Sequence, residues 1–489
     1  MNRISAWLLV AVVAWGFSAP ISVSAENSHP AEKPNIVLIV SDDQGYQDLG
    51  VLGDHILTPH LDRLAREGTR LTNFYVTWPA CTPSRGSLLT GRYPQRNGIY
   101  DMIRNEAPDY GHKYRPDEYA VTWERIGGMD VREIHLPQLL QQAGYYCGIF
   151  GKWDLGMHRR FLPLQRGWDE FYGFVNTGID YYTHERYGIP SMYRGNSPTN
   201  EDQGTYCTYL FQREAVRFVI ENRDRPFFLY LPFNAPHNAS SLDPKIRPAA
   251  QAPETWRKRY PELHAQEGFV EGARYGQPAQ VPNRALRQTH YLGSVTAMDA
   301  AIGEVLDLLD EFGVAENTLV IFFSDNGGAR GVGADNGPLR GGKGNLFEGG
   351  VRVCALVRYP GHIPPATVND EFLTALEWLP TLINLAGVQP PDDLILDGFD
   401  LLPVLAGEEP SPRQAMFWKR RGQEACRVGS WKWLRHDGRV YLFDLAEDLG
   451  EQRNLAESHP DKTREMQAHF EAWLAEMEAA EPRGPFRDY

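Results

Sequence analysis

Four polar side chains follow two similar apolar runs of the sequence and could bind a metal ion together: Asp42, Asp43, Asp325 and Asn326. The first two come directly after Asn35–Ser41, and the other two directly after Thr318–Ser324. Unbroken runs of β-branched and aromatic residues are typical of strands buried on both faces of a parallel sheet. Ligands of open α/β sheets bind beyond the carboxyl ends of such strands. Carboxylates gathered there repel one another unless a cation holds them.

The ligand types narrow the choice of ion. An all-oxygen set suits a hard cation such as Ca²⁺ or Mg²⁺, and no His or Cys lies beside these four residues, which argues against zinc. The alternative for any single Asp after a strand is a turn or a helix cap. Two matching strand ends favour the metal site.

A second cluster begins at Cys81. Pro83 and Ser84 can open a helix that stops at Gly91, so Cys81 lies at or just before a helix N-terminus. Free N–H groups and the helix dipole favour an anion there. A bare thiol at this place is expected to have a lowered pKa and could act as a nucleophile. The alternative is a small buried cysteine with a packing role.

The pattern of apolar residues in the rest of the sequence predicts the strands and helices that position these residues. Further strands are expected at residues 145–150, 226–231 and 353–357, and helices at residues 58–68, 136–143, 205–222 and 286–312. The first helix has Thr58 as N-cap and Pro59 in its first turn. Strands that alternate with helices predict a large, doubly wound, mostly parallel or mixed α/β sheet flanked by helices.

The last part of the chain changes character near residue 412. Short strand-like pieces are expected at residues 416–418, 426–428, 431–434 and 441–444, and a helix at about 462–478. We therefore expect a catalytic α/β domain over residues 26–411 and a small C-terminal antiparallel sheet with one helix over 412–489. Three irregular stretches, residues 100–132, 178–200 and 238–282, are expected to be substrate walls or plain surface insertions.

Composition excludes several classes of protein. The chain has 489 residues and a formal charge of −14, which disfavours nucleic acid as a partner. Hydrophobic residues at 42% and charged residues at 23% exclude disorder and a multi-span membrane protein. Five cysteines are too few for a disulfide scaffold. Oligomeric state is not indicated.

The N-terminus has the pattern of a secretory signal. Arg3 precedes an apolar run over residues 6–17, and small residues end at Ala25, where cleavage is expected. The alternative, a membrane anchor, would need about 20 apolar residues, and Pro20 interrupts this run. The protein is expected to be secreted or periplasmic, with no membrane span.

The cluster at Cys81 resembles a known family. The run Cys81-Thr-Pro-Ser-Arg85, followed by Leu89-Thr-Gly-Arg92, is similar to the C-x-P-S-R and L-T-G-R signature of type I sulfatases, within the alkaline phosphatase superfamily. Other matching segments occur in the family's order: residues 34–43, 151–153, 234–237, 324–327, 341–343, 441–444 and 451–455. The paired signature is highly specific. Each of the other matches is weak alone, but together they support the resemblance because they occur in the family's order.

The resemblance implies a mechanism. Cys81 would be oxidised by a formylglycine-generating enzyme, and one hydroxyl of the hydrated formylglycine would attack sulfur while the other later regenerates the aldehyde. Asp42, Asp43, Asp325, Asn326 and residue 81 would hold the ion, with Ca²⁺ favoured over Mg²⁺. The implied catalytic residues are Arg85, Lys152 and Lys343, which stabilise charge, and His237 or Lys343, which protonates the leaving oxygen. The alternative for the three cations is a solvated surface charge.

Asp154 departs from the family pattern. The G-K-W motif is usually followed by His, and here Asp154 occupies that place. A carboxylate could accept the same proton when sulfate is released. The alternatives are that Asp154 turns away and another group such as His158 acts, or that the exit step is slow.

These features predict a sulfuric ester hydrolase that acts on a sulfated carbohydrate or an aryl sulfate. The alternatives are a phosphomonoester or phosphonate ester hydrolase, and a sulfated-glycan binding protein without turnover. The other cysteines, Cys147, Cys207, Cys354 and Cys426, could form up to two disulfides. Packing is the expected role of the two that fall inside predicted strands, at positions 147 and 354.

Overall fold

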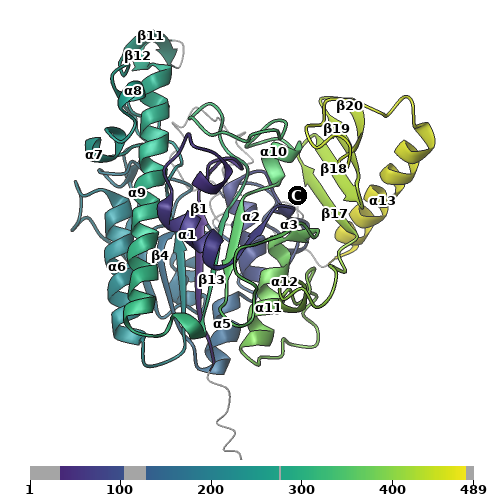
Figure 1. Ribbon diagram of the computed structural model, residues 1–489, viewed down its shortest axis with the longest axis horizontal. Helices are drawn as coiled ribbons and strands as arrows, with labels where there is room; N and C mark the ends of the chain where they lie inside the picture. Colours follow the sequence, from purple (N-terminus) through teal and green to yellow (C-terminus); the bar gives the residue numbers. More distant parts are fainter. Residues whose placement is uncertain (1–32, 104–127, 275–276, 481–489) are drawn as a thin grey trace, which may run out of the picture. The chain divides into compact units, whose positions relative to one another are not determined.

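A ten-stranded mixed sheet lies at the centre of the computed structural model, which describes residues 33–103, 128–274 and 277–480 (Figure 1). In spatial order its strands are β15 (Thr367–Asn369), β2 (Thr69–Leu71), β14 (Ala355–Arg358), β13 (Thr318–Ser324), β1 (Asn35–Ser41), β10 (Phe227–Pro232), β4 (Tyr146–Lys152), β5 (Glu170–Phe174), β8 (Met192–Arg194) and β9 (Ser197–Pro198). The central strands β13, β1, β10, β4 and β5 run parallel, whereas β14 and β8 are antiparallel to their inner neighbours. The predicted fold class is confirmed.

The two faces of β1 belong to two hydrophobic cores. Ile36, Leu38 and Val40 contribute to one core, while Val37 and Ile39 contribute to the other, and all five are fully buried. The first core is covered by α2 (Cys81–Thr90), α5 (Leu136–Leu140) and α11 (Trp378–Leu385), and the second by α1 (Pro59–Glu67), α6 (Cys207–Asn222) and α9 (Arg284–Glu311). Burial on both faces explains why the strand sequence is uniformly apolar.

The expected helices and inner strands are present, with ends that shift by a few residues. The helix expected at 136–143 divides into α5 and a 3₁₀ turn at Gln141–Ala143. The regions expected to be irregular hold short elements: β6 (Glu185–Arg186), β7 (Ile189–Pro190), β8, β9, α7 (Glu254–Arg257), α8 (Pro261–His264), and the hairpin β11 (Phe269–Arg274) and β12 (Gln277–Pro282). The expected signal peptide, and residues 104–127 of the first irregular stretch, lie outside the described residues.

The first helix is capped by a residue from another helix. Thr58 stands at the N-cap of α1, but its hydroxyl donates to Asp62 of the same helix (3.0 Å) and accepts no hydrogen bond from an N–H group of α1. The carboxylate of Asp299, on α9, instead accepts hydrogen bonds from the backbone N–H groups of His60 (3.2 Å) and Leu61 (2.7 Å). Thr58 therefore occupies the predicted N-cap position, but the capping hydrogen bonds come from Asp299.

The C-terminal part is a four-stranded antiparallel sheet with one helix, as predicted. Its elements are β17 (Ala415–Arg420), β18 (Gln423–Val428), β19 (Trp431–His436), β20 (Arg439–Asp444) and α13 (Pro460–Ala479). Residues of this sheet share a hydrophobic core with Tyr75 and Leu346 of the preceding part. Buried Lys432 joins the two parts, because its ammonium contacts Glu348 (2.8 Å) and Glu451 (3.0 Å). The division near residue 412 stays a prediction.

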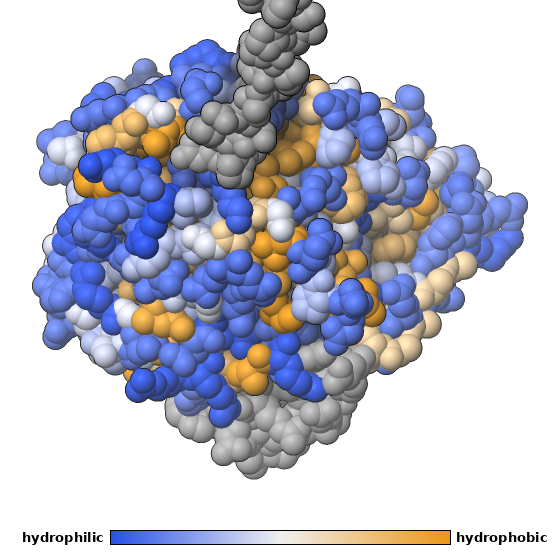
Figure 2. Space-filling view, turned by 90° about the horizontal axis from the view of Figure 1, so that it is seen from below, coloured by the Kyte–Doolittle hydropathy of each residue, from blue (hydrophilic) through white to orange (hydrophobic). Residues whose placement is uncertain are grey.

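No helix among the described residues is long and apolar enough to cross a membrane. Figure 2 shows one face of the molecule, on which small hydrophobic patches alternate with hydrophilic residues.

The five cysteines are all free and buried, so no disulfide forms. The expected packing role of Cys147 and Cys354 agrees with their burial.

Candidate active site

The register of two strands brings the predicted metal ligands together. β1 and β13 pair in parallel with Ser41 opposite Ser324, so the residues that follow them leave the sheet side by side. The backbone N–H of Asp43 donates to the Asp325 carboxylate (3.2 Å). Asp43 has a φ of 70°, in the left-handed region, which Asp and Asn adopt more readily than most residues.

Asp42, Asp43, Asp325 and Cys81 form a compact buried cluster, in which one ligand atom from each residue lies within 4.8 Å of the others. Asn326 donates its Nδ2 to Asp43 (2.8 Å), while its Oδ1 is buried with no hydrogen-bond partner among the described residues. A buried polar atom without a partner is costly unless a ligand satisfies it. These residues could hold a metal ion, and their oxygen atoms would suit a hard cation.

Cys81 begins α2 and is fully buried. Its Sγ lies 3.3 Å from Oδ1 of Asp42 and 4.0 Å from Oδ1 of Asp43. Burial, reinforced by Asp42, raises the pKa of the thiol well above its ordinary value. The expectation of a lowered pKa at this helix N-terminus was wrong, because burial and the carboxylates outweigh the nearby lysines. An unmodified thiol would stay protonated here and would be a weak nucleophile.

Each carboxylate of the cluster accepts a hydrogen bond from a different cation. Arg85 donates to Asp325 through Nε (2.9 Å), Lys152 to Asp42 (2.7 Å), and Lys343 to Asp43 (2.6 Å). Burial opposes the charge of both lysines, but the carboxylates outweigh it and the lysine pKa values are raised. All three cations therefore lie in the site, and the surface-charge alternative was wrong.

Lys343 differs from the other two cations in its exposure. Its side chain is 25% exposed, against 0% for Lys152 and 1% for Arg85. Its ammonium also lies 3.7 Å from Sγ of Cys81. Lys343 therefore stands between residue 81 and solvent.

His237 follows β10 and completes the cluster. Its Nδ1 donates to the carbonyl of Asn238 (2.7 Å), and its Nε2 lies 3.7 Å from Oδ2 of Asp43. Burial, together with Lys343, lowers the pKa of His237 to about 3. The ring is neutral at ordinary pH, and because Nδ1 holds the proton, Nε2 is a hydrogen-bond acceptor.

Asp154 is also brought to this site. It follows β4 with a φ of 59°, is buried, and accepts a hydrogen bond from the Thr82 hydroxyl (2.8 Å). Its carboxylate lies 3.7 Å from the ammonium of Lys152. Burial raises the pKa of Asp154 to about 6, although Lys152 and Arg85 act in the opposite direction. Sequence reasoning missed Thr82, whose only signal was its place beside Cys81.

His158, the alternative proton acceptor, lies in a different setting. Its ring packs edge-on against Phe161, with 6.5 Å between the ring centroids. Asp154, in contrast, accepts a hydrogen bond from Thr82, the neighbour of residue 81, and it does not turn away from the site.

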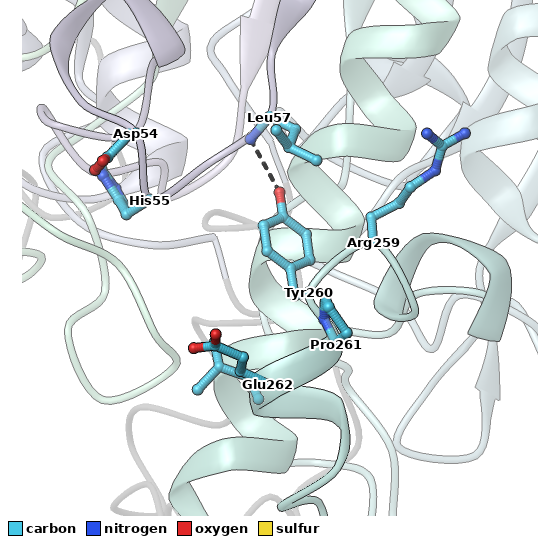
Figure 3. Close-up of a pocket in the computed structure, with 8 residues that line it drawn as sticks. Asp54, His55, Leu57, Arg259, Tyr260, Pro261 and Glu262 are labelled. Atoms are coloured by element: carbon cyan, nitrogen blue, oxygen red, sulfur yellow. Dashed lines mark hydrogen bonds between the residues drawn. The ribbon is translucent and has the colours of Figure 1, made fainter.

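A surface pocket of about 270 Å³ lies apart from this cluster (Figure 3). It is lined by Asp54, His55, Leu57, Arg259, Tyr260, Pro261, Glu262 and Leu263. Tyr260 points its hydroxyl at the backbone N–H of Leu57, from which it accepts a hydrogen bond (3.0 Å). The pocket shares no residue with the carboxylate cluster.

Comparison with protein families decides the identity of the chain. The family model Sulfatase matches residues 34–388, and a second model, described as N-sulphoglucosamine sulphohydrolase, C-terminal, matches residues 342–480. The chain belongs to the sulfatase family. This sulfatase is a sulfuric ester hydrolase, as the sequence predicted.

Curated relatives and a solved structure agree with this assignment. Human N-acetylgalactosamine-6-sulfatase is 34% identical over 82% of this chain and 72% of its own length, and human arylsulfatase A is 32% identical over 93% and 90%. The crystal structure of Ps i-CgsB is 30% identical, with a TM-score of 0.76 over 90% of this chain and 93% of that one. The sulfatase fold thus extends over nearly the whole molecule.

Proposed function

We propose that this sulfatase cleaves sulfate esters of a carbohydrate, with Cys81 converted to formylglycine and a Ca²⁺ ion bound beside it. The observation that carries the proposal is the convergence of residue 81 with three carboxylates, one ligand atom of each lying within 4.8 Å of the others. A formylglycine-generating enzyme is the partner that this maturation requires.

The proposed ion would be held by the carboxylates and amide of the cluster: Asp42, Asp43, Asp325 and Asn326, with residue 81 as a further ligand. The unpartnered Oδ1 of Asn326 supports this set. Several oxygen ligands with flexible geometry suit Ca²⁺ better than Mg²⁺, which keeps most of its waters. When bound, the ion would offset negative charge on the sulfate group.

The proposed modification supplies the nucleophile that the unmodified thiol lacks. Burial holds the Cys81 thiol in its protonated form. A hydrated formylglycine would instead offer a hydroxyl for attack on sulfur, and its second hydroxyl would allow the sulfated residue to return to the aldehyde.

Lys343 is the proposed proton donor to the leaving oxygen. It is the most exposed of the three cations and lies 3.7 Å from Sγ of residue 81, so it can reach both the ester and the solvent side of the site. His237 is neutral, with its proton on Nδ1 directed at a carbonyl. We therefore assign His237 to sulfate binding and orientation, while Arg85 and Lys152 stabilise developing charge from the buried side.

Asp154 is the proposed acceptor of the proton that leaves residue 81 when sulfate is released. Its pKa of about 6 gives an ionised carboxylate near neutral pH. Its hydrogen bond to Thr82, the residue next to Cys81, supports this role.

A carbohydrate substrate and secretion are also proposed. Ps i-CgsB has a structure in complex with k-i-k-neocarrahexaose, with 30% identity and a TM-score of 0.74 to this chain. The relatives include N-acetylgalactosamine-6-sulfatases, whose name specifies a sulfated sugar. The apolar run in residues 1–25 supports export to the periplasm or the cell exterior.

A substrate comparison tests the function. The purified protein is assayed with 4-nitrophenyl sulfate, 4-nitrophenyl phosphate and a panel of defined sulfated oligosaccharides, with desulfated products identified by mass spectrometry. We expect turnover of sulfate esters, with the highest kcat/KM on an oligosaccharide. Preference for the phosphate ester would favour the phosphoesterase alternative. Binding of oligosaccharides without turnover would favour a glycan-binding protein.

A further inference from the structure

We infer that two arginines beside Lys343, Arg330 and Arg420, form a second anion-binding site, which takes a sulfate ester or carboxylate on the sugar next to the one that is desulfated. This inference rests on the proposed carbohydrate substrate and specifies its class, a polyanionic oligosaccharide.

The two arginines contact the glycine-rich loop at the residues directly before and after Lys343. A Cβ placed on Gly342 would lie 3.5 Å from Cγ of Arg330. Nη1 of Arg420 donates to the carbonyl of Gly344 (2.5 Å). Cα atoms two residues apart lie at most about 7 Å from each other. The two arginine side chains therefore contact the loop on either side of the lysine that faces the opening.

Neither of these arginines forms an ion pair with a carboxylate among the described residues, although the charge of Asp101 acts on Arg420. Within the same residues, the carbonyl of Gly344 is the hydrogen-bond partner of Arg420. The adjacent Arg421, which is 55% exposed, does pair with Asp101 (3.0 Å). Arg330 and Arg420, which we call the arginine cluster, thus carry positive charge without an ion pair in the described part of a chain whose net charge is −14.

Crowding of like charge supports a role in anion binding. Burial and the neighbouring Arg421 lower the pKa of Arg420 from its ordinary value, and Asp101 offsets this only in part; the guanidinium remains charged. An anion beside Arg420 would offset its repulsion by Arg421. Arginine is well suited to the task, because its planar donors bind sulfate-like and carboxylate oxygens in pairs.

The position of the cluster specifies which group it would bind. Lys343 lies at the exposed side of the catalytic cluster, so the sulfate ester to be cleaved is expected to enter past it. An anionic group on the adjoining sugar would then come close to the arginines on either side of Lys343. A single-charged aryl sulfate has no group to place there.

The test compares two substrate types in matched variants. For each protein, kcat/KM is measured on 4-nitrophenyl sulfate and on oligosaccharides with anionic groups on adjacent sugars, and the ratio of the two values is taken. We expect Arg330→Ala to lower this ratio about tenfold, mainly through KM of the oligosaccharide, and Arg330→Glu to lower it further. Arg439→Ala, an exposed arginine on β20, is the control and should keep the ratio of the wild type.

Salt dependence gives a second measurement. KM for the oligosaccharide should rise more steeply with ionic strength in the wild type than in Arg330→Ala, because exposed charge pairs are screened. An unchanged ratio in both Arg330 variants would overturn the second site while leaving the sulfatase assignment intact. A wild-type enzyme that cleaves the aryl sulfate but no oligosaccharide would overturn the carbohydrate substrate as well.

Discussion

The Thr82 hydroxyl donates a hydrogen bond of 2.8 Å to the carboxylate of Asp154. Thr82 adjoins Cys81 on α2, whereas Asp154 follows β4 on another part of the sheet. This bond ties the end of β4 to the N-terminus of α2. It also places a carboxylate with a pKa of about 6 against the chain neighbour of the residue that is expected to carry the nucleophile.

The first prediction concerns the role of Asp154 in turnover. Asp154→Asn should lower kcat by about 100-fold and change KM little, because an amide cannot accept the proton that general-base catalysis requires. Asp154→His should retain part of the activity, since imidazole can accept a proton. Steady-state kinetics on 4-nitrophenyl sulfate decide this, and near-normal kcat in Asp154→Asn would remove the residue from the mechanism.

The pH profile tests the same assignment. The raised pKa means that Asp154 is protonated below about pH 6 and cannot accept a proton there. In the wild type, kcat should therefore fall as the pH drops through about 6. Asp154→Asn should lack this acid limb, with a flat, low kcat over the same range.

The second prediction concerns Cys81. Mass spectrometry of the peptide spanning residues 71–85 should show formylglycine in active protein. Cys81→Ala should abolish turnover and leave the unfolding transition nearly unchanged, because only one small buried side-chain atom is lost. Fully active protein that carries an unmodified thiol would refute the proposed nucleophile.

The third prediction concerns the metal ion. Dialysis against a chelator should abolish activity and lower the melting temperature, and added Ca²⁺ should restore both, because a ligand that binds only the folded state stabilises it. Asp325→Ala should cost most of the activity and most of the Ca²⁺-induced rise in melting temperature. Elemental analysis that found zinc, or full activity without metal, would contradict this site.

The fourth prediction concerns folding stability. Asp299→Ala should cost about 2–3 kcal/mol in the free energy of unfolding, because two N–H groups of α1, one of them at buried Leu61, lose their acceptor. Asp299→Asn keeps an acceptor oxygen and should cost less. Urea denaturation of the two variants measures the difference, and equal stability of wild type and Asp299→Ala would contradict the capping role.

The same residue should give stability a pH dependence. Burial raises the pKa of Asp299 from 3.8 to about 7 in the folded protein. The folded state therefore holds this proton more tightly than the unfolded state, so the contribution is complete below about pH 4 and is lost as the pH rises through 7. Asp299→Asn should show a smaller decline in stability between pH 4 and pH 7 than the wild type.

The strands that carry the site could be predicted because their local sequence alone identifies them. β1 and β13 are continuous apolar runs with polar residues directly after them, and both have the expected bounds. β5 was missed, because its sequence, Glu-Phe-Tyr-Gly-Phe, is short and includes a charge and a glycine. Its extended form depends on pairing with β4, which no local pattern shows.

Contacts between distant segments were the features that the sequence could not show. Thr82 and Asp154 are 72 positions apart, and Asp299 caps a helix more than 200 positions earlier in the chain. The direction of the Cys81 pKa shift was predicted wrongly because it also depends on distant segments. The sequence showed that Cys81 begins a helix, but the burial of the thiol and its contact with Asp42 come from tertiary packing.

The ion pair between Lys432 and Glu348 makes the catalytic part of the protein depend on the C-terminal part. A premature stop codon after residue 411 would remove Lys432 and leave Glu348 a buried charge without this partner. It would also remove Arg420, which fixes the carbonyl next to Lys343. Nonsense mutations late in the reading frame should therefore inactivate the enzyme as completely as early ones, and a shortened chain is a poor starting point for engineering a smaller catalyst.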